Sequence, residues 1–103
     1  MAEKAYMISI CEKTDDDMST IVAQAADELL NITDVKAAFV ICDMGGQISI
    51  SGRSFGDVNV QVILEKLGGG GHISIAGAQI TGKTKEEVYE DLLAAIAEYK
   101  ASL

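Results

Sequence analysis

Residues 59–72 read Asn-Val-Gln-Val-Ile-Leu-Glu-Lys-Leu-Gly-Gly-Gly-Gly-His, and the expected fold is organised around this stretch. Its apolar residues recur at the i, i+3, i+4, i+7 spacing of one helix face, which is occupied by Val60, Ile63, Leu64 and Leu67. Asn59 is a residue type that caps helix N-termini, and Gly68 stands where glycine commonly ends a helix. The stretch therefore predicts a helix over residues 60–67.

The four glycines after this helix are more than a helix cap requires. Each costs about 0.5–1 kcal/mol of backbone entropy relative to alanine, so the run indicates a backbone that something approaches closely. With Gly68 assigned to the cap, the amides of Gly69, Gly70 and Gly71 are left to line a concave nest for an anion; a flexible loop is the plain alternative. His72 is the only histidine and follows the run directly, so we expect it to contact a ligand.

A polar strip is expected on the strand that precedes this helix. Gly45 and Gly46 predict a hairpin turn, and the following residues alternate between apolar and polar up to Arg53 and Ser54. Simple exposure to solvent is the favoured explanation of the strip on the strand pattern alone. Arg53, with its planar fork of donors, and the short polar residues Ser54 and Asn59 are nevertheless well suited to bind phosphate oxygens together with glycine amides.

The remaining segments define the fold class. A capping box from Thr84 to Glu87 begins a last helix that should end near Ala101. We expect an α/β fold in which a small mixed β-sheet packs with about three helices, in the order β-α-β-β-α-β-α. The other expected elements are a strand at 6–11, a helix from about 14 to 30, a doubly covered strand at 37–42, a short turn or helix after residue 72, and a strand at about 78–81.

Composition restricts the function. The 103 residues suit one domain, and 16 acidic against 8 basic residues give a net charge of −8, which disfavours binding along the phosphates of DNA or RNA. Cys11 and Cys42 lie in apolar stretches and read as buried free thiols, while residues 15–17, three aspartates, read as a solvated helix start. We therefore expect no metal ligand and no catalytic residue in this chain, and a cytoplasmic location.

The segment from Ser51 to His72, with Arg-Ser, Asn-Val and Gly-Gly-Gly-His in this order, closely resembles the DHH-associated C-terminal domain of DHH-type phosphoesterases. More narrowly, it is similar to that domain in the membrane-bound cyclic di-AMP phosphodiesterases of the GdpP type. The likeness is strongest over residues 51–78, and the flanking elements fit, so residues 1–103 are expected to form a single DHH-associated domain. Many relatives read Ala-Ala-Gly where this chain has Ile75, Ala76 and Gly77.

The resemblance implies that catalysis and substrate binding lie in two different domains. A separate catalytic DHH domain of the same parent chain, carrying Asp and His ligands for two manganese ions, would hydrolyse cyclic di-AMP to pApA. The present domain would bind no cofactor itself and would form the substrate-holding wall of the cleft. It would be a cytoplasmic part, without membrane contact, of a protein anchored in the bacterial plasma membrane, and a homodimer is compatible with this arrangement. The expected substrate-binding residues are Arg53, Ser54, Asn59, Gly69, Gly70, Gly71 and His72.

Three other functions stay open at this stage. The same motif recurs in phosphatases of nanoRNA and of 3'-phosphoadenosine 5'-phosphate. A related domain ends alanyl-tRNA synthetases, which makes a non-catalytic RNA-binding module a second alternative, although the charge of −8 disfavours it. A purely structural assembly domain is the third.

Overall fold

The computed structural model describes residues 6–12, 26, 35–55 and 58–102. Its strands form one sheet in the order β1-β2-β3-β5-β4, with β1 parallel to β2 and every other pair antiparallel. The elements in chain order are β1 (Tyr6–Glu12), β2 (Ala37–Asp43), β3 (Ile48–Ser54), α2 (Val60–Glu65), β4 (Gly70–Gly71), β5 (Ile75–Ile80) and α3 (Lys85–Ala101). The predicted α/β class with a mixed sheet is thus confirmed.

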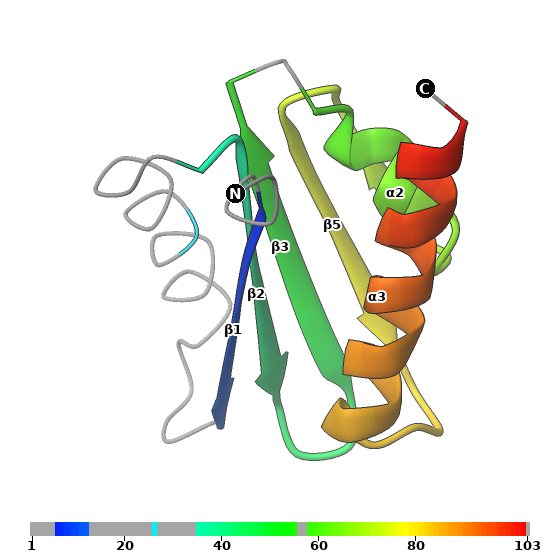
Figure 1. Cartoon of the computed structure of the whole chain (residues 1–103). Coiled ribbons are helices and arrows are strands. Elements are labelled where there is room, and N and C mark those ends of the chain that lie inside the picture. Colours follow the sequence, from blue (N-terminus) through cyan, green and yellow to red (C-terminus); the bar gives the residue numbers. More distant parts are fainter. Residues whose placement is uncertain (1–5, 13–25, 27–34, 56–57, 103) are drawn as a thin grey trace.

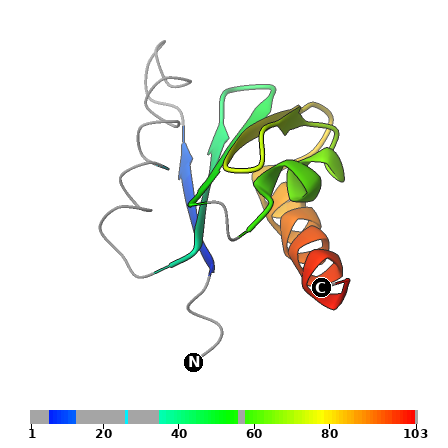
Figure 2. The ribbon, with the colours of Figure 1, turned by 90° about the horizontal axis from the view of Figure 1, so that it is seen from above.

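Two helices, α2 and α3, lie together on one face of the sheet (Figures 1 and 2). Phe39 and Ile41 of β2 and Ile50 of β3 point into this layer, where they meet Leu64 of α2 and Leu92 of α3, all at most 1% exposed. The expected helix over residues 14–30 lies outside the described residues except for Ala26, which is helical and buried.

Strand β2 is buried on both of its faces, as its unbroken apolar run predicts. Ala38, Val40 and Cys42 point away from the two helices and are nevertheless at most 2% exposed. Cys42 is a buried free thiol, in agreement with the prediction, whereas the side chain of Cys11 lies outside the described part of the chain.

The ends of both helices agree with the predicted signals. Asn59 caps α2, since its Oδ1 accepts a hydrogen bond from Val62 N at 3.1 Å. Thr84 and Glu87 form the predicted capping box of α3. The two helices are also joined directly, because the Tyr99 hydroxyl of α3 accepts a hydrogen bond from the backbone N of Asn59 at 3.0 Å. None of the helices in the described part of the chain is long and apolar enough to cross a membrane.

One local prediction was wrong in part. The short turn expected after His72 is present, but the strand that we expected at about 78–81 is β5 and begins at Ile75, and Gly70–Gly71 form the short strand β4 beside it. The small residues Ala76 and Ala78 fill the helix side of β5, so the strand has no run of large apolar residues to reveal it. Ile75, Gly77 and Gln79 alternate with them on the other face.

The link between Tyr99 and Asn59 predicts the effect of one substitution. Tyr99→Phe removes the hydroxyl that accepts the hydrogen bond from the backbone N–H of Asn59. It should lower the free energy of unfolding by about 1 kcal/mol, as measured by urea denaturation. Tyr89→Phe, on the same helix but without this link, is the matched control and should change it by less. Equal effects of the two substitutions would contradict a role for the link.

Candidate functional site

The candidate site lies on the sheet face turned away from α2 and α3, which we call the distal face. Arg53 and Ser51 of β3 are on this face, and their register partners on β5 are Ile75 and Gly77. Over β2 the distal face is covered, as described above, but over β3 and β5 it is partly open, with Ile75 52% exposed. The predicted polar strip on β3 is therefore present and lies beside β5.

Strand β4 extends this pattern by one position. Gly70 pairs with Gly77, and His72 N donates to Ile75 O at 2.6 Å. Alternation along β4 therefore places Gly70 beside Gly77 and His72 beside Ile75 on the distal face. Arg53, Ile75 and His72 form one row across the sheet, and we call it the Arg53–His72 row.

The Arg53–His72 row brings the two strongest predicted ligand contacts near each other. With about 4.8 Å between neighbouring strands, the Cα atoms of Arg53 and His72 are about 10 Å apart, within reach of an arginine side chain and an imidazole that share one phosphate. The Arg53 side chain is half-buried, and its Nη1 donates to the carbonyl oxygen of Gly52 at 3.0 Å. His72 is exposed.

Ser54 lies at the same end of β3 but serves the fold. It is 6% exposed, and its hydroxyl donates to Val58 O at 2.7 Å and to Ile73 O at 3.4 Å. Its backbone N donates to Ser74 O at 2.9 Å, and Val60 N donates to Ile73 O at 2.9 Å. These bonds fasten the turn after His72 to the end of β3 and to the start of α2.

Asn59 is near the same turn, because it caps α2, and the first residue of α2, Val60, donates its backbone N–H to Ile73 O. Its Oδ1 is used by the cap, so its amide Nδ2 is the group that it could offer to a ligand. Arg53, Ser54, Asn59 and His72 thus gather at one end of the sheet, at the top of Figure 1. Whether each contacts a substrate stays a prediction.

The glycine run turns the chain back along the sheet. Gly68 has φ +90° and donates to Glu65 O at 3.1 Å, while Gly69 N donates to Leu64 O at 2.9 Å. This pair of bonds is a Schellman motif, so the predicted helix-ending role of Gly68 is confirmed. The Gly69 amide is thereby engaged, and Gly70 pairs with Gly77 in the ladder between β4 and β5. The Gly71 amide is then the donor of the run that a ligand could reach.

The four glycines differ in what a side chain would meet. A Cβ at Gly69 would lie 2.1 Å from Gly77 O, and one at Gly71, where φ is +147°, would lie 2.4 Å from Ile75 O. At Gly70 nothing lies within 4 Å of the added Cβ, and φ is not in the positive range that excludes side chains. The fold explains three glycines, since Gly68 has open space but a positive φ, and Gly69 and Gly71 meet backbone atoms. Gly70 alone of the four combines open space with a φ that other residues adopt, and it lies on the distal face.

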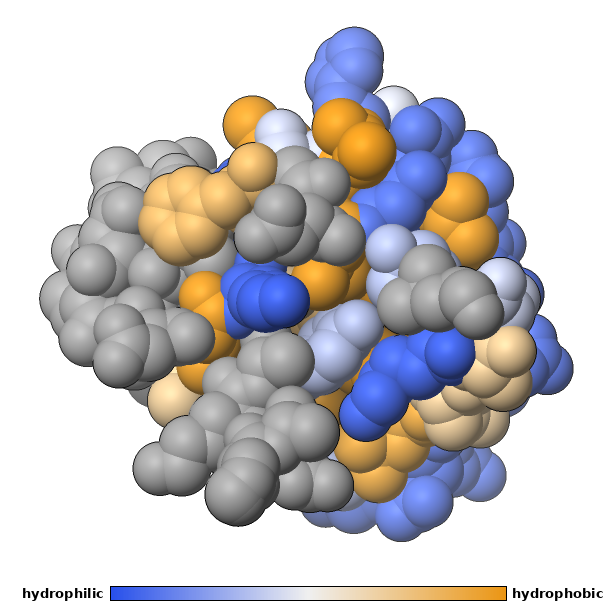
Figure 3. Space-filling view, turned by 45° about the horizontal axis from the view of Figure 1, so that its top comes forward, coloured by the Kyte–Doolittle hydropathy of each residue, from blue (hydrophilic) through white to orange (hydrophobic). Residues whose placement is uncertain are grey.

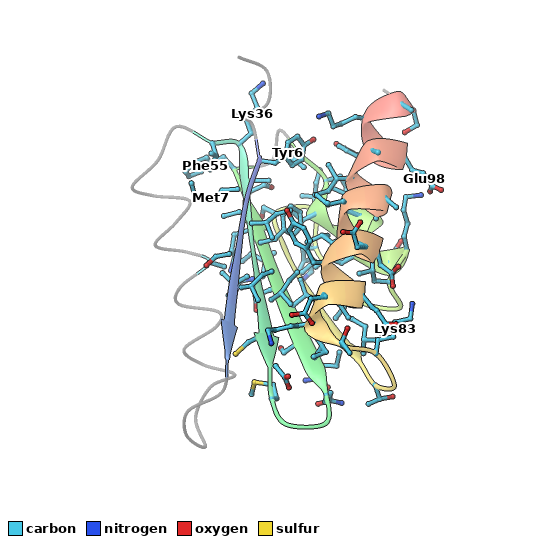
Figure 4. The ribbon with its side chains drawn as sticks, turned by 60° about the horizontal axis from the view of Figure 1, so that its bottom comes forward. Tyr6, Met7, Lys36, Phe55, Lys83 and Glu98 are labelled. Atoms are coloured by element: carbon cyan, nitrogen blue, oxygen red, sulfur yellow. The ribbon has the colours of Figure 1, made fainter. Side chains whose placement is uncertain are left out.

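Sequence reasoning missed an apolar patch beside these residues, formed by Phe55, Ile73 and Ile75, which are 65%, 49% and 52% exposed. They surround the hydrogen bond between Ser54 and Ser74, and Figure 3 shows apolar and strongly polar side chains adjoining at this end. Lys36, exposed and next to the residue that pairs with Ser54, is a further cation there, and Figure 4 shows it near Phe55. The sequence did contain a signal for this patch, because Phe55 directly follows Ser54 and Ile73 directly follows His72.

In the described part of the chain, no three side chains of His, Cys, Asp or Glu come close enough together to hold a metal ion. The groups at the candidate site are a guanidinium, an imidazole and a backbone amide, which suit an anionic ligand.

Comparison with known proteins shows the family of this chain. The DHHA1 domain family matches residues 4–102, so the chain belongs to the DHHA1 domain family. It is 51% identical over 80 residues to the cyclic-di-AMP phosphodiesterase GdpP of Geobacillus thermodenitrificans, covering 77% of this chain and 12% of that protein. It is 47% identical over 87 residues to the cyclic-di-AMP phosphodiesterase PdeA of Listeria monocytogenes, covering 82% of this chain and 13% of that protein. It is therefore a DHH-associated domain similar to that of GdpP-type proteins.

A third relative has another activity. Over 51 residues, which are 50% of this chain and 16% of the relative, the chain is 45% identical to the bifunctional oligoribonuclease and PAP phosphatase NrnA of Thermus thermophilus. The chain spans only about an eighth of the length of the GdpP and PdeA relatives.

Among solved structures, the C-Ala domain of Aquifex aeolicus alanyl-tRNA synthetase superposes with a TM-score of 0.72. The match covers 91% of this chain and 88% of that domain at 16% identity, and it shows a shared fold.

The glycine geometry predicts opposite outcomes for two neighbouring substitutions. Gly69→Ala forces a methyl group into the carbonyl of Gly77 and should lower the free energy of unfolding by about 2–3 kcal/mol. Gly70→Ala points its methyl group into open space and should stay within about 0.5 kcal/mol of the parent. Chemical denaturation of both variants checks this, and a destabilised Gly70→Ala beside a stable Gly69→Ala would contradict the described turn.

Proposed function

We propose that this chain is the substrate-binding domain of a metal-dependent cyclic di-AMP phosphodiesterase. It would hold a phosphate of the nucleotide in a cleft, and a separate DHH domain of the same parent chain would hydrolyse the phosphodiester to pApA. The observation that carries this proposal is the Arg53–His72 row beside the open space at Gly70. The identity to GdpP and PdeA supports the choice of cyclic di-AMP.

The electrostatics of the site support an anionic ligand of limited size. The chain carries a net charge of −8, so a long polyanion would be repelled, yet its only arginine lies in the Arg53–His72 row. Lys36 adds a second cation at the same end of the sheet. In the proposed complex, the Arg53 fork and the His72 imidazole donate to phosphate oxygens, the Gly71 amide adds a neutral donor, and Asn59 contributes its Nδ2.

The apolar patch supports a partner surface next to this site. Phe55, Ile73 and Ile75 expose about half or more of their surface, which is typical of a region that another protein surface covers. In the proposed enzyme this surface is the catalytic DHH domain, which would close the cleft from the other side and exclude water from the bound phosphate. The same proposal places the manganese ions in the DHH domain and the parent protein at the bacterial plasma membrane, with this domain in the cytoplasm.

A second candidate function has its own support. The identity to NrnA favours a short RNA or 3'-phosphoadenosine 5'-phosphate as the substrate of the parent enzyme. Both ligands present a terminal phosphate next to a nucleoside, so the same row would bind them. Turnover of all three substrates by the full-length protein distinguishes the candidates, and a clear preference for short RNA would remove cyclic di-AMP as the principal substrate.

The proposed phosphate contact is tested with Arg53. In the full-length protein, Arg53→Ala should lower kcat/KM for cyclic di-AMP by about 10- to 100-fold, the range expected when a charged hydrogen bond to the ligand is lost. Arg53→Lys keeps the charge but loses the planar fork and should recover only part of the activity.

The matched control is Lys83→Ala, which removes a cation at the opposite end of the molecule (Figure 4), where Lys83 pairs with Asp91 at 2.5 Å. Its kcat/KM should equal that of the parent protein. If Arg53→Ala retains full activity in a folded protein, the proposed role of the Arg53–His72 row is wrong.

A further inference from the structure

A shallow hollow of about 510 Å³ lies next to the Arg53–His72 row, within the size range of small-molecule sites. Its lining residues are Ser49, Ile50, Ser51, Gly68, Gly69, Gly77, Ala78 and Gln79. The register places four of them in two further rows on the distal face. Ser51 and Gly77 form a floor that carries a small side chain or none, with Gly70 next to Gly77 in the same row, and Ser49 with Gln79 forms the row beyond it.

Ser49 lines this hollow, and no hydrogen bond of its hydroxyl is found in the described part of the chain. Ser49 is 8% exposed, so more than nine tenths of the residue is buried. Within residues 6–12, 26, 35–55 and 58–102, no side-chain hydrogen bond from Ser49 is found, and no fully buried side-chain oxygen or nitrogen lacks a partner. The hydroxyl therefore keeps access to the hollow, where a ligand could accept or donate a hydrogen bond in place of water.

The chemistry of the hollow differs from that of the Arg53–His72 row. Ser49 and Gln79 each offer a donor and an acceptor and carry no charge. An amide side chain matches the donor and acceptor pair on the edge of a nucleobase, and adenine is a frequent partner of such amides. Phosphate, which only accepts hydrogen bonds, is better served by Arg53 and His72.

We propose that this hollow binds the nucleoside attached to the phosphate held by the Arg53–His72 row, with the base edge at Ser49 and Gln79. The assignment rests on the proposed function of that row. Ser49 and Arg53 are four positions apart on β3, which corresponds to about 13 Å along an extended strand, comparable with the span of one nucleotide from phosphate to base edge. The ribose would lie over Gly77 and Gly70, whose lack of side chains leaves room for it. Gln79 is then a residue that determines base specificity.

The test uses two ligands that differ only in the base, AMP and ribose 5-phosphate, titrated calorimetrically into the full-length protein. Gln79→Ala and Ser49→Ala should each weaken AMP binding about three- to tenfold, as for the loss of one neutral hydrogen bond, while the Kd of ribose 5-phosphate stays the same. Gln47→Ala, a glutamine outside the hollow, is the matched control and should alter neither Kd. Thermal unfolding confirms that each variant is folded.

The outcomes separate this inference from the proposed function. If Arg53→Ala weakens both ligands while Gln79→Ala and Ser49→Ala change neither, the hollow is not the base site although the phosphate site holds. An equal loss for both ligands in Gln79→Ala also overturns base recognition. If Arg53→Ala leaves both affinities unchanged, the proposed function itself fails.

Discussion

The close approach of the glycine turn to β5 is the constraint on which the rest of the site depends. Gly68 ends α2 in a left-handed conformation, and the backbone of Gly69 then passes so near Gly77 that no side chain fits between them. The chain can therefore turn back within two residues and run beside β5. As a result, the turn that contains His72 returns to the start of α2 and the end of β3, where hydrogen bonds to Ser54 and Val60 hold it.

This geometry divides the predicted motif between fold and ligand. Ser54, Gly68, Gly69 and Gly71 are accounted for by contacts within the domain, whereas Arg53, Gly70 and His72 present a row and an open space on the distal face. Under the proposed function the motif serves two purposes, because the residues that shape the turn also determine where the proposed binding groups lie. Substitutions within it should therefore separate into those that change stability and those that change ligand affinity, which is a sharper expectation than the motif alone provides.

Much of the fold follows from local sequence signals. Helices α2 and α3 have strong periodicity and explicit caps at Asn59 and Thr84, and β2 has an apolar run that only a doubly covered strand explains. The start of β5 could not be predicted, because Ala76 and Ala78 are small and the glycines opposite them create the strand pairing through backbone contact. Likewise, the sequence placed Arg53 and His72 in one binding group, but their common face depends on the register of β3, β5 and β4, which is a long-range property.

The central claim is that the Arg53–His72 row holds a phosphate of a nucleotide. The most direct measurement is a crystal structure of the full-length protein with pApA bound. The account predicts a phosphate within hydrogen-bond distance of the Arg53 guanidinium and the His72 imidazole, with the open side of Gly70 facing the ligand. A nucleotide bound in the catalytic cleft without any contact to Arg53, Gly70 or His72 would contradict it.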